Sequence, residues 1–396
     1  MKTTSENNTL TIYLDGRIDT GNAAAAERDI LGAAEGRSED IVLDAGKLEY
    51  ISSAGLRVLM KLRKMIKKPL PIINVGNDIY DILETTGFTE LLEVKRALRQ
   101  VSVEGCELIG KGGNGSVYRI SEDEIIKVYT PRTSFESIEE ERELARSAFI
   151  AGVPTAIPYD VVRVGENYGI VFEMVKADVI ARKFMNEPAS FDEYADKYSR
   201  LFKEIHSVSL AGKGLPSTKQ IYLEDIARLD DWYEDSELER MKWFIGQIPD
   251  SDTMVHGDFH TNNIMIQGEE LLIIDMAEIS CGDPIFDLAS SYFAHMLNPR
   301  LDPDSVMKYL NVTPDIAMRL WGRMMRVYFG TEDSEKLKRY DSVIEGFCLL
   351  KAALAPAIWV NMPEERKKAS VESARKYLFP QMESLLAGLA EMRTAP

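Results

Sequence analysis

The residues best suited to chemistry lie in one short segment, HGDFHTNN at residues 256–263, and in an aspartate that follows twelve residues later. Asp258 can accept a proton from an attacking hydroxyl, while Asn263 and Asp275 supply hard oxygen ligands that suit Mg²⁺ bridging nucleotide phosphates. The step from Asp258 to Asn263 makes a loop, and the step to Asp275 fits a short hairpin that brings the second ligand back. Carboxylates and amides in loops are often only turn formers, so this chemistry needs support from elsewhere in the chain.

A glycine-rich run upstream completes the pattern G-x-G-x-x-G-x-V between two strand-like segments. Glycines let the backbone approach phosphates closely, and exposed amide groups bind them. One alternative is a purely structural turn. Another is the dinucleotide fingerprint, which needs a helix directly after the glycines, whereas residues 116–120 are strand-like. We therefore predict a hairpin lid over a nucleotide, with these residues assigned to nucleotide binding: Gly110, Gly112, Gly113, Asn114, Gly115 and Val117.

Lys127 follows in the next strand, between apolar neighbours. It is either an edge-strand lysine in solvent or a charge that holds the α- and β-phosphates and is oriented by a carboxylate on a nearby helix. Glu141 is the best partner, because apolar residues follow it at i+3, i+4 and i+7 and it shares their inward face. Glu140 and Glu143 remain alternatives. The order of glycine loop, lysine and catalytic segment is the order that a phosphotransferase requires.

The elements that must position these residues fall into two patterns, and 396 residues are too many for one ordinary domain. Residues 1–100 alternate strands, expected at 10–14, 40–43, 71–75 and 91–94, with helices, expected at 22–31, 54–66 and 79–84. This alternation implies a small sheet covered by helices.

Residues 101–176 are rich in strands and residues 177–396 in helical periodicity. Strands are expected at 104–109, 116–120, 125–128, 161–164 and 168–175, around a charged helix at 137–150. Beyond about residue 190 only two strands are expected, at 264–266 and 271–274. We therefore predict an α+β multidomain chain, in which an α/β domain (1–100) precedes a β-rich lobe (101–176) and a helical lobe (177–396).

The charge of the chain is uneven. The whole sequence has 47 Lys and Arg against 64 Asp and Glu, a net charge of −17, yet residues 1–100 hold 14 basic and 15 acidic side chains. Nearly all of the negative charge therefore lies in residues 101–396. Nucleic-acid binding needs clustered basic surface, so we expect no nucleic-acid partner, and an acidic region attracts cationic substrates.

The cysteines and the apolar runs indicate where in the cell the protein is expected. Cys106, Cys281 and Cys348 lie far apart without metal-ligand spacing, which argues against a disulfide scaffold or a zinc site. The first ten residues lack the apolar core of a signal peptide, and the most apolar late stretch, residues 347–360, is short and interrupted by a lysine and a proline. We expect a cytoplasmic protein with no membrane segment.

Residues 104–390 resemble the aminoglycoside and choline phosphotransferase branch of the protein-kinase-like fold. HGDFHTNN matches the H-G-D-x-H-x-x-N of that branch, and GDPIFDLA at residues 282–289 is similar to its G-D-P-x-x-D-L-A. The resemblance implies a bilobal fold that uses ATP and Mg²⁺. The roles it implies are a catalytic base at Asp258, metal ligands at Asn263 and Asp275, a phosphate contact at Lys127, an adenine hinge in the backbone of Glu173 to Val175, and a support for the catalytic loop at Asp287.

Departures from protein kinases favour a small-molecule acceptor. His260 stands where Ser/Thr kinases usually carry Lys, and twelve residues from Asp275 to Asp287 leave no room for a long activation segment. Met-Ala-Glu follows Asp275 in place of the branch's commoner Asp-Trp/Phe-Glu, so Glu278 is either a further polar ligand or a surface residue.

Residues 9–98 resemble a STAS domain of the anti-sigma-factor-antagonist type. YLDGRIDTGNA, IVLDAGKLEYISSAGLRVLMKLRKM and INVGNDIYDILETTGFTELLEV occur in the family's order and spacing. The resemblance makes Ser53 a phosphoacceptor candidate and implies a regulatory protein partner, although Ser52 stands where the family commonly has Asp. Ser53 also has an ordinary interpretation as the N-cap of the helix at 54–66.

These observations predict an ATP- and Mg²⁺-dependent phosphotransferase that acts on a hydroxyl of a small, cationic molecule, with a STAS module for regulation or docking. An alternative is a signalling protein whose kinase-like part phosphorylates Ser53 of its own or a partner STAS domain. A further alternative is a nucleotide-binding sensor without catalysis.

Overall fold

The computed structural model describes residues 2–6, 8–66, 68–112, 114–359 and 362–393. The chain divides into two compact units, one of residues 1–102 with 162–165 and the other of residues 103–161 with 166–396. Each unit has a hydrophobic core of its own. Gly113, assigned above to nucleotide binding, lies outside the described residues.

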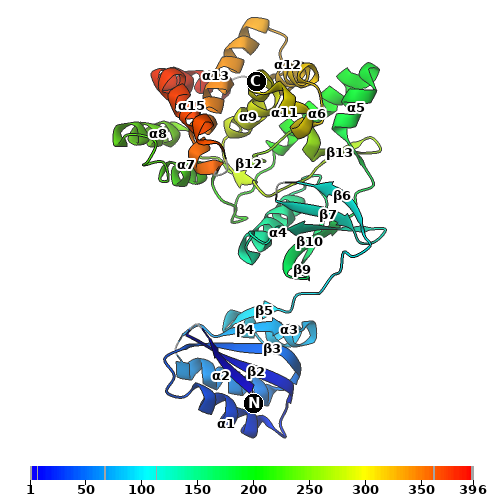
Figure 1. Ribbon diagram of the computed structural model, residues 1–396, viewed down its shortest axis with the longest axis vertical. Helices are drawn as coiled ribbons and strands as arrows, with labels where there is room; N and C mark the ends of the chain where they lie inside the picture. Colours follow the sequence, from blue (N-terminus) through cyan, green and yellow to red (C-terminus); the bar gives the residue numbers. More distant parts are fainter. Residues whose placement is uncertain (1, 7, 67, 113, 360–361, 394–396) are drawn as a thin grey trace. The chain divides into compact units, whose positions relative to one another are not determined.

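The first unit is built on a five-stranded sheet of order β1-β2-β3-β4-β5 (Figure 1, blue to cyan). β1 is antiparallel to β2, and the other pairs are parallel. In β2, Leu10, Ile12 and Leu14 are buried while the residues between them are partly exposed, so the strand turns one face to the core. The elements are β1 (Lys2–Glu6), β2 (Thr9–Ile18), α1 (Ala23–Ala34), β3 (Asp40–Ile51), α2 (Ser53–Ile66), β4 (Pro71–Val75), α3 (Asn77–Thr85) and β5 (Glu93–Arg96).

The start of α2 corrects one expectation. The Gly55 N–H donates to Ser52 Oγ at 3.4 Å, so Ser52 and not Ser53 supplies the capping oxygen. A Cβ on Gly55 would lie 2.9 Å from the carbonyl oxygen of Ile18, which shows how closely this first turn packs against the end of β2. The Ser53 side chain is left exposed on the first residue of the helix.

The β-rich lobe is a sheet of order β6-β7-β8-β10-β9, and helix α4 contacts β10. β6 and β7 form an antiparallel hairpin around the glycines, so no helix follows them and the dinucleotide fingerprint does not apply. A Cβ on Gly115 would lie 2.2 Å from the Val128 carbonyl oxygen, so this glycine lets β7 approach β8. The elements are β6 (Glu107–Lys111), β7 (Gly115–Arg119), β8 (Glu124–Tyr129), α4 (Phe135–Ile150), β9 (Pro158–Val164) and β10 (Asn167–Glu173).

The helical lobe packs α6 against α12, and α13 against α9 and α16 (Figure 1, green to red). Its helices are α5 (Ile180–Asn186), α6 (Phe191–Ile205), α7 (Thr218–Ile226), α8 (Asp235–Gln247), α9 (Ile285–Tyr292), α10 (Asn298–Leu301), α11 (Pro303–Leu310), α12 (Pro314–Phe329), α13 (Ser334–Ala353), α14 (Ala355–Ile358), α15 (Glu364–Ser373) and α16 (Met382–Arg393). Its strands are β11 (Asp178–Val179), β12 (Met254–Val255), β13 (Ile264–Gln267), β14 (Glu270–Ile273) and β15 (Ser280–Cys281).

Two of these strands follow the segment at residues 256–263. β13 and β14 form an antiparallel hairpin, and the Ile274 N–H donates to the Asn263 carbonyl at 2.9 Å, so the hairpin returns the chain to the segment as expected. The predicted fold, a small sheet-and-helix domain followed by a β-rich lobe and a helical lobe, is confirmed. Within the described ranges, no helix is both long enough and apolar enough to cross a lipid bilayer.

Candidate active site

The loop that carries Asp258 runs from β12 to β13 and is held by a buried carboxylate on α9. Asp287 accepts the His256 N–H at 2.8 Å on Oδ2 and the Gly257 N–H at 2.9 Å on Oδ1. His206 Nε2 lies 3.0 Å from Oδ2. Burial raises the pKa of Asp287, but the hydrogen bond from His206 and the charges of His206 and His256 bring it below its ordinary value. An ionised carboxylate therefore fixes the backbone of the loop.

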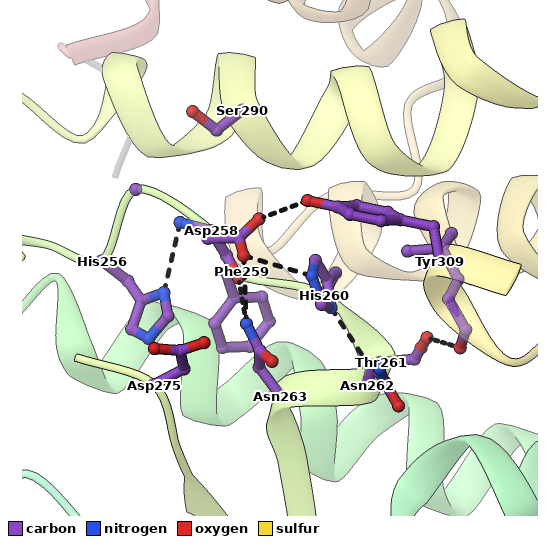
Figure 2. Close-up of polar contacts among 12 residues, drawn as sticks. His256, Asp258, Phe259, His260, Thr261, Asn262, Asn263, Asp275, Ser290 and Tyr309 are labelled. Carbon is purple, nitrogen blue, oxygen red and sulfur yellow. Dashed lines mark hydrogen bonds and ion pairs between the residues drawn. The ribbon is translucent and has the colours of Figure 1, made fainter. Parts of the chain in front are cut away.

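Asp258 itself receives three side-chain donors (Figure 2). Asn263 Nδ2 donates to Oδ2 at 3.2 Å, and His260 Nε2 lies 3.3 Å from the same oxygen. The Tyr309 hydroxyl donates to Oδ1 at 3.0 Å. The Asn262 N–H donates to His260 Nδ1, so the proton of a neutral His260 lies on Nε2, facing Asp258.

The charge state of Asp258 follows from its surroundings. Burial raises its pKa, but the hydrogen bond and charge of His260, with the charges of His256 and Lys351, bring the pKa well below its ordinary value. The carboxylate is therefore ionised at neutral pH and able to accept a proton.

Lys127 connects the two lobes. Its Nζ donates to Glu141 Oε1 on α4 at 2.8 Å and to Asp275 Oδ1 at 3.1 Å. Burial lowers the pKa of Lys127, and the charges of Asp275 and Glu141 more than offset this, so the pKa rises. Of the three glutamates considered, Glu141 is the one that pairs with Lys127, whereas Glu143 pairs with Arg142.

Asn263 contacts Asp258, and the Ile274 N–H bond to the Asn263 carbonyl brings the next residue, Asp275, back to the same segment (Figure 2). Asp275 follows β14 in the left-handed region, with φ +65°. Within the described part of the chain, both hydrogen bonds of the Asn263 side chain use Nδ2, which leaves its carbonyl oxygen for a ligand. No group of three or more His, Cys, Asp and Glu side chains among the described residues is arranged to hold a metal ion, so an ion here would draw on one amide and one carboxylate together with oxygens from a bound ligand.

The glycine hairpin and the strand end expected at the hinge belong to the same sheet as Lys127. Val117 in β7 is paired with Lys127 in β8, which places the hairpin beside the lysine. Asn114 accepts the Thr130 N–H on its carbonyl oxygen at 3.1 Å. Gly110 lies in β6, and the Gly112 N–H donates to the Gly115 carbonyl at 2.9 Å across the turn. The hairpin therefore adjoins the strand from which the lysine projects.

The hinge segment begins where β10 ends. Glu173 is its last residue, and its carboxylate accepts the Ile157 N–H at 3.4 Å. Val175 accepts the Ala177 N–H on its carbonyl oxygen at 2.9 Å. The Glu173 side chain is therefore engaged within the protein.

Two residues at the site were missed by the sequence reasoning. Tyr309 is 51 residues from Asp258 and belongs to no motif. Lys351 Nζ donates to the Gly257 carbonyl at 3.1 Å and to Ser290 Oγ at 2.7 Å, so from α13 it supports the loop that carries Asp258. Lys351 stands alone in an apolar helical run, and a charge there is rarely buried without a partner. The sequence could therefore have indicated that Lys351 has a specific partner.

Glu278 lies near the same loop. A Cβ on Gly257 would be 2.9 Å from Glu278 Cβ. The surrounding protein and the charges of Asp258 and Asp275 raise the pKa of Glu278, while Lys351 opposes the rise. Glu278 is thus part of the electrostatic environment of Asp258, with its side chain exposed.

Known proteins are similar to both units. The phosphotransferase enzyme family matches residues 105–322, and the STAS domain family matches residues 1–101. BtrV of Bordetella bronchiseptica, described as an anti-sigma factor antagonist, is 30% identical over 84 residues, which are 20% of this chain and 72% of BtrV.

Among solved structures, a streptomycin–ATP–APH(2")-IIa ternary complex is 18% identical, covers 70% of this chain and 92% of its own, and has a TM-score of 0.45. A choline/ethanolamine kinase family protein from Mesorhizobium loti is 18% identical, covers 72% and 92%, and has a TM-score of 0.46. The phosphotransferase family accounts for more than half of the chain, and the STAS family for most of the remainder. The chain is a STAS domain joined to a member of the phosphotransferase enzyme family.

Proposed function

We propose that the second unit transfers the γ-phosphate of ATP to a hydroxyl of a small cationic molecule. We propose also that the STAS domain regulates this activity or serves for docking. The observation that carries the proposal is the grouping of an ionised Asp258 with Asn263, Asp275 and the Lys127–Glu141 pair. Phosphoryl transfer depends mainly on positioning and charge stabilisation, and these residues supply both.

In the proposed reaction, Asp258 accepts the proton of the acceptor hydroxyl as the hydroxyl oxygen bonds to the γ-phosphorus and ADP leaves. Lys127, oriented by Glu141, binds the α- and β-phosphates. The glycine hairpin covers them, and the backbone from Glu173 to Val175 binds the adenine. Asn263 and Asp275 would hold Mg²⁺, which neutralises phosphate charge when bound.

The acceptor class follows from the room and charge at the site. β15 and α9 follow Asp275 almost directly, so no long segment is available to dock a protein substrate. Asp258, Asp275 and Glu278 place three carboxylates near the loop at residues 256–263, and two lysines oppose them, Lys351 at the loop and Lys127 on Asp275. This balance favours a cationic acceptor.

The test is ATP-dependent phosphorylation across a panel of aminoglycosides, amino alcohols and sugars. Asp258→Asn should lower turnover about a hundredfold or more, because the general base is lost. Asp250→Asn is the control, since Asp250 is 88% exposed and pairs with Lys219. Unchanged turnover in Asp258→Asn, or no phosphorylation of any acceptor in the panel, would contradict the proposal.

A second candidate function is phosphorylation of Ser53, favoured by its exposure and by its freedom from the capping role that Ser52 takes. A phosphate on the first residue of α2 would lie at a helix N-terminus, where amide groups and the dipole favour negative charge. Mass spectrometry after incubation of the full chain with ATP and Mg²⁺ should find phosphate that Ser53→Ala removes and Ser52→Ala leaves. An unmodified Ser53 would count against this candidate.

A further inference from the structure

Three side chains donate hydrogen bonds to the Asp258 carboxylate without any help from the molecule that would accept the phosphate. His260 and Asn263 engage Oδ2, and the Tyr309 hydroxyl engages Oδ1 (Figure 2). A carboxylate acting as general base must receive a hydrogen bond from the hydroxyl that it deprotonates. An ionised carboxylate has about four acceptor sites on its two oxygens, and Oδ2 already has two donors, so the acceptor hydroxyl should approach Oδ1, where Tyr309 is the one side-chain donor among the described residues.

Exposure identifies which donor can yield. The His260 and Asn263 residues are only 4% and 7% exposed, whereas Tyr309 is 45% exposed. The tyrosine ring contacts His260 edge to face, with the ring centroids 4.8 Å apart. Solvent thus reaches the Tyr309 side chain, while the other two donors are enclosed by the protein.

The backbone around Tyr309 is anchored to the catalytic segment. Thr261 Oγ1 donates to the Leu310 carbonyl at 2.6 Å, and the Asn311 side chain donates to that of Asn262. The end of α11 is therefore held against the turn at Thr261–Asn263, so a rotation of the Tyr309 side chain can release Asp258 without moving the helix. The surrounding protein and the negative charge of Asp258 raise the pKa of Tyr309, so its hydroxyl keeps its proton and remains a donor.

We infer that the Tyr309 hydroxyl caps Asp258 Oδ1 in the resting enzyme and that the acceptor hydroxyl replaces it there, so that Asp258 does not activate water while no acceptor is bound. This inference rests on the proposed function. The exchange moves only hydrogen bonds. In turnover the proton passes from the acceptor hydroxyl to Asp258, the acceptor oxygen bonds to the γ-phosphorus, and the bond from that phosphorus to the departing ADP oxygen breaks.

The experiment measures ATP hydrolysis by the full chain with Mg²⁺ and no acceptor. Tyr309→Phe removes one oxygen and leaves space for a water beside Asp258 Oδ1, so hydrolysis should rise about tenfold, the factor for losing one hydrogen bond to a charged group. Tyr377→Phe is the matched control, because Tyr377 is also about half exposed, and it should leave hydrolysis unchanged. Damage to the fold would lower hydrolysis, so a rise is specific to the cap.

Two measurements separate the possible failures. Calorimetric titration with ATP tests nucleotide binding, and the double variant Asp258→Asn with Tyr309→Phe should abolish the gain. Binding of ATP with unchanged or lower hydrolysis in Tyr309→Phe would overturn the cap and leave the proposed function standing. Phosphate found on Tyr309 by mass spectrometry would show that the Tyr309 hydroxyl is itself a nucleophile, which would also overturn its role as a cap. Absence of ATP binding would overturn the proposed function and the cap with it.

Discussion

At the scale of single residues, the charge of the loop that carries Asp258 depends on a few contacts. Asp287 binds two backbone amides of the loop, and Lys351 binds its carbonyl at Gly257. The lysine charge also favours ionisation of Asp258 and of Glu278. A positive and a negative side chain thus hold the two ends of the same short peptide segment, so the loop geometry and the basicity of Asp258 are coupled.

Lys351→Met should lower Asp258-dependent ATP turnover about tenfold, because the Gly257 carbonyl loses a charged donor whose hydrogen bond is worth roughly 1.5–3 kcal/mol. The effect should appear in kcat, since Lys351 contacts the loop and none of the residues predicted to bind the nucleotide. Lys338→Met is the control on the same helix, with a side chain 72% exposed. Wild-type kcat in Lys351→Met would show that the contact does not position the loop.

At the scale of elements, prediction succeeded where local pattern decides structure. The hairpin expected at 264–266 and 271–274 is observed as β13 and β14, shifted by at most one residue at each end. Its strands are short apolar runs bounded by polar turns. By contrast, β1 has the sequence KTTSE, without one apolar residue, and it is a strand because it pairs with β2. No local pattern could have indicated it.

The same distinction applies to the site. The sequence favoured Glu141 as the partner of Lys127 because its apolar neighbours indicate an inward helix face, but Glu140 and Glu143 stayed open until the structure showed the pair. β3 was expected to end at residue 43 but runs to Ile51, since its second half, in which polar residues and glycine interrupt the apolar ones, is held by pairing with β2 across register shifts. Tyr309 reaches Asp258 through the packing of α11 on the catalytic turn, which depends on the tertiary fold alone.

At the scale of the whole molecule, the two units can be followed separately. The four tryptophans, Trp232, Trp243, Trp321 and Trp359, all lie in the second unit, so tryptophan fluorescence reports the unfolding of that unit. Its core includes the buried His295, whose Nδ1 donates to the Ser291 carbonyl at 2.8 Å and whose Nε2 lies 3.3 Å from the Tyr198 hydroxyl. This histidine makes the stability of the second unit sensitive to pH.

Burial lowers the pKa of His295 to about 4, from 6.5 in an unfolded chain, against the opposing hydrogen bond to Ser291. The unfolded state therefore binds the extra proton first as the pH falls, so stability contributed by neutral His295 is complete above pH 6.5 and is lost between about pH 6.5 and 4. The loss amounts to about 3 kcal/mol. Denaturant unfolding followed by tryptophan fluorescence should show the free-energy difference between wild type and His295→Gln narrowing by that amount from pH 7 to pH 4. Asp258 and Asp287 have lowered pKa values, so their protonation affects stability only below this pH range. Parallel plots of unfolding free energy against pH for the two proteins would show that His295 does not cause the loss.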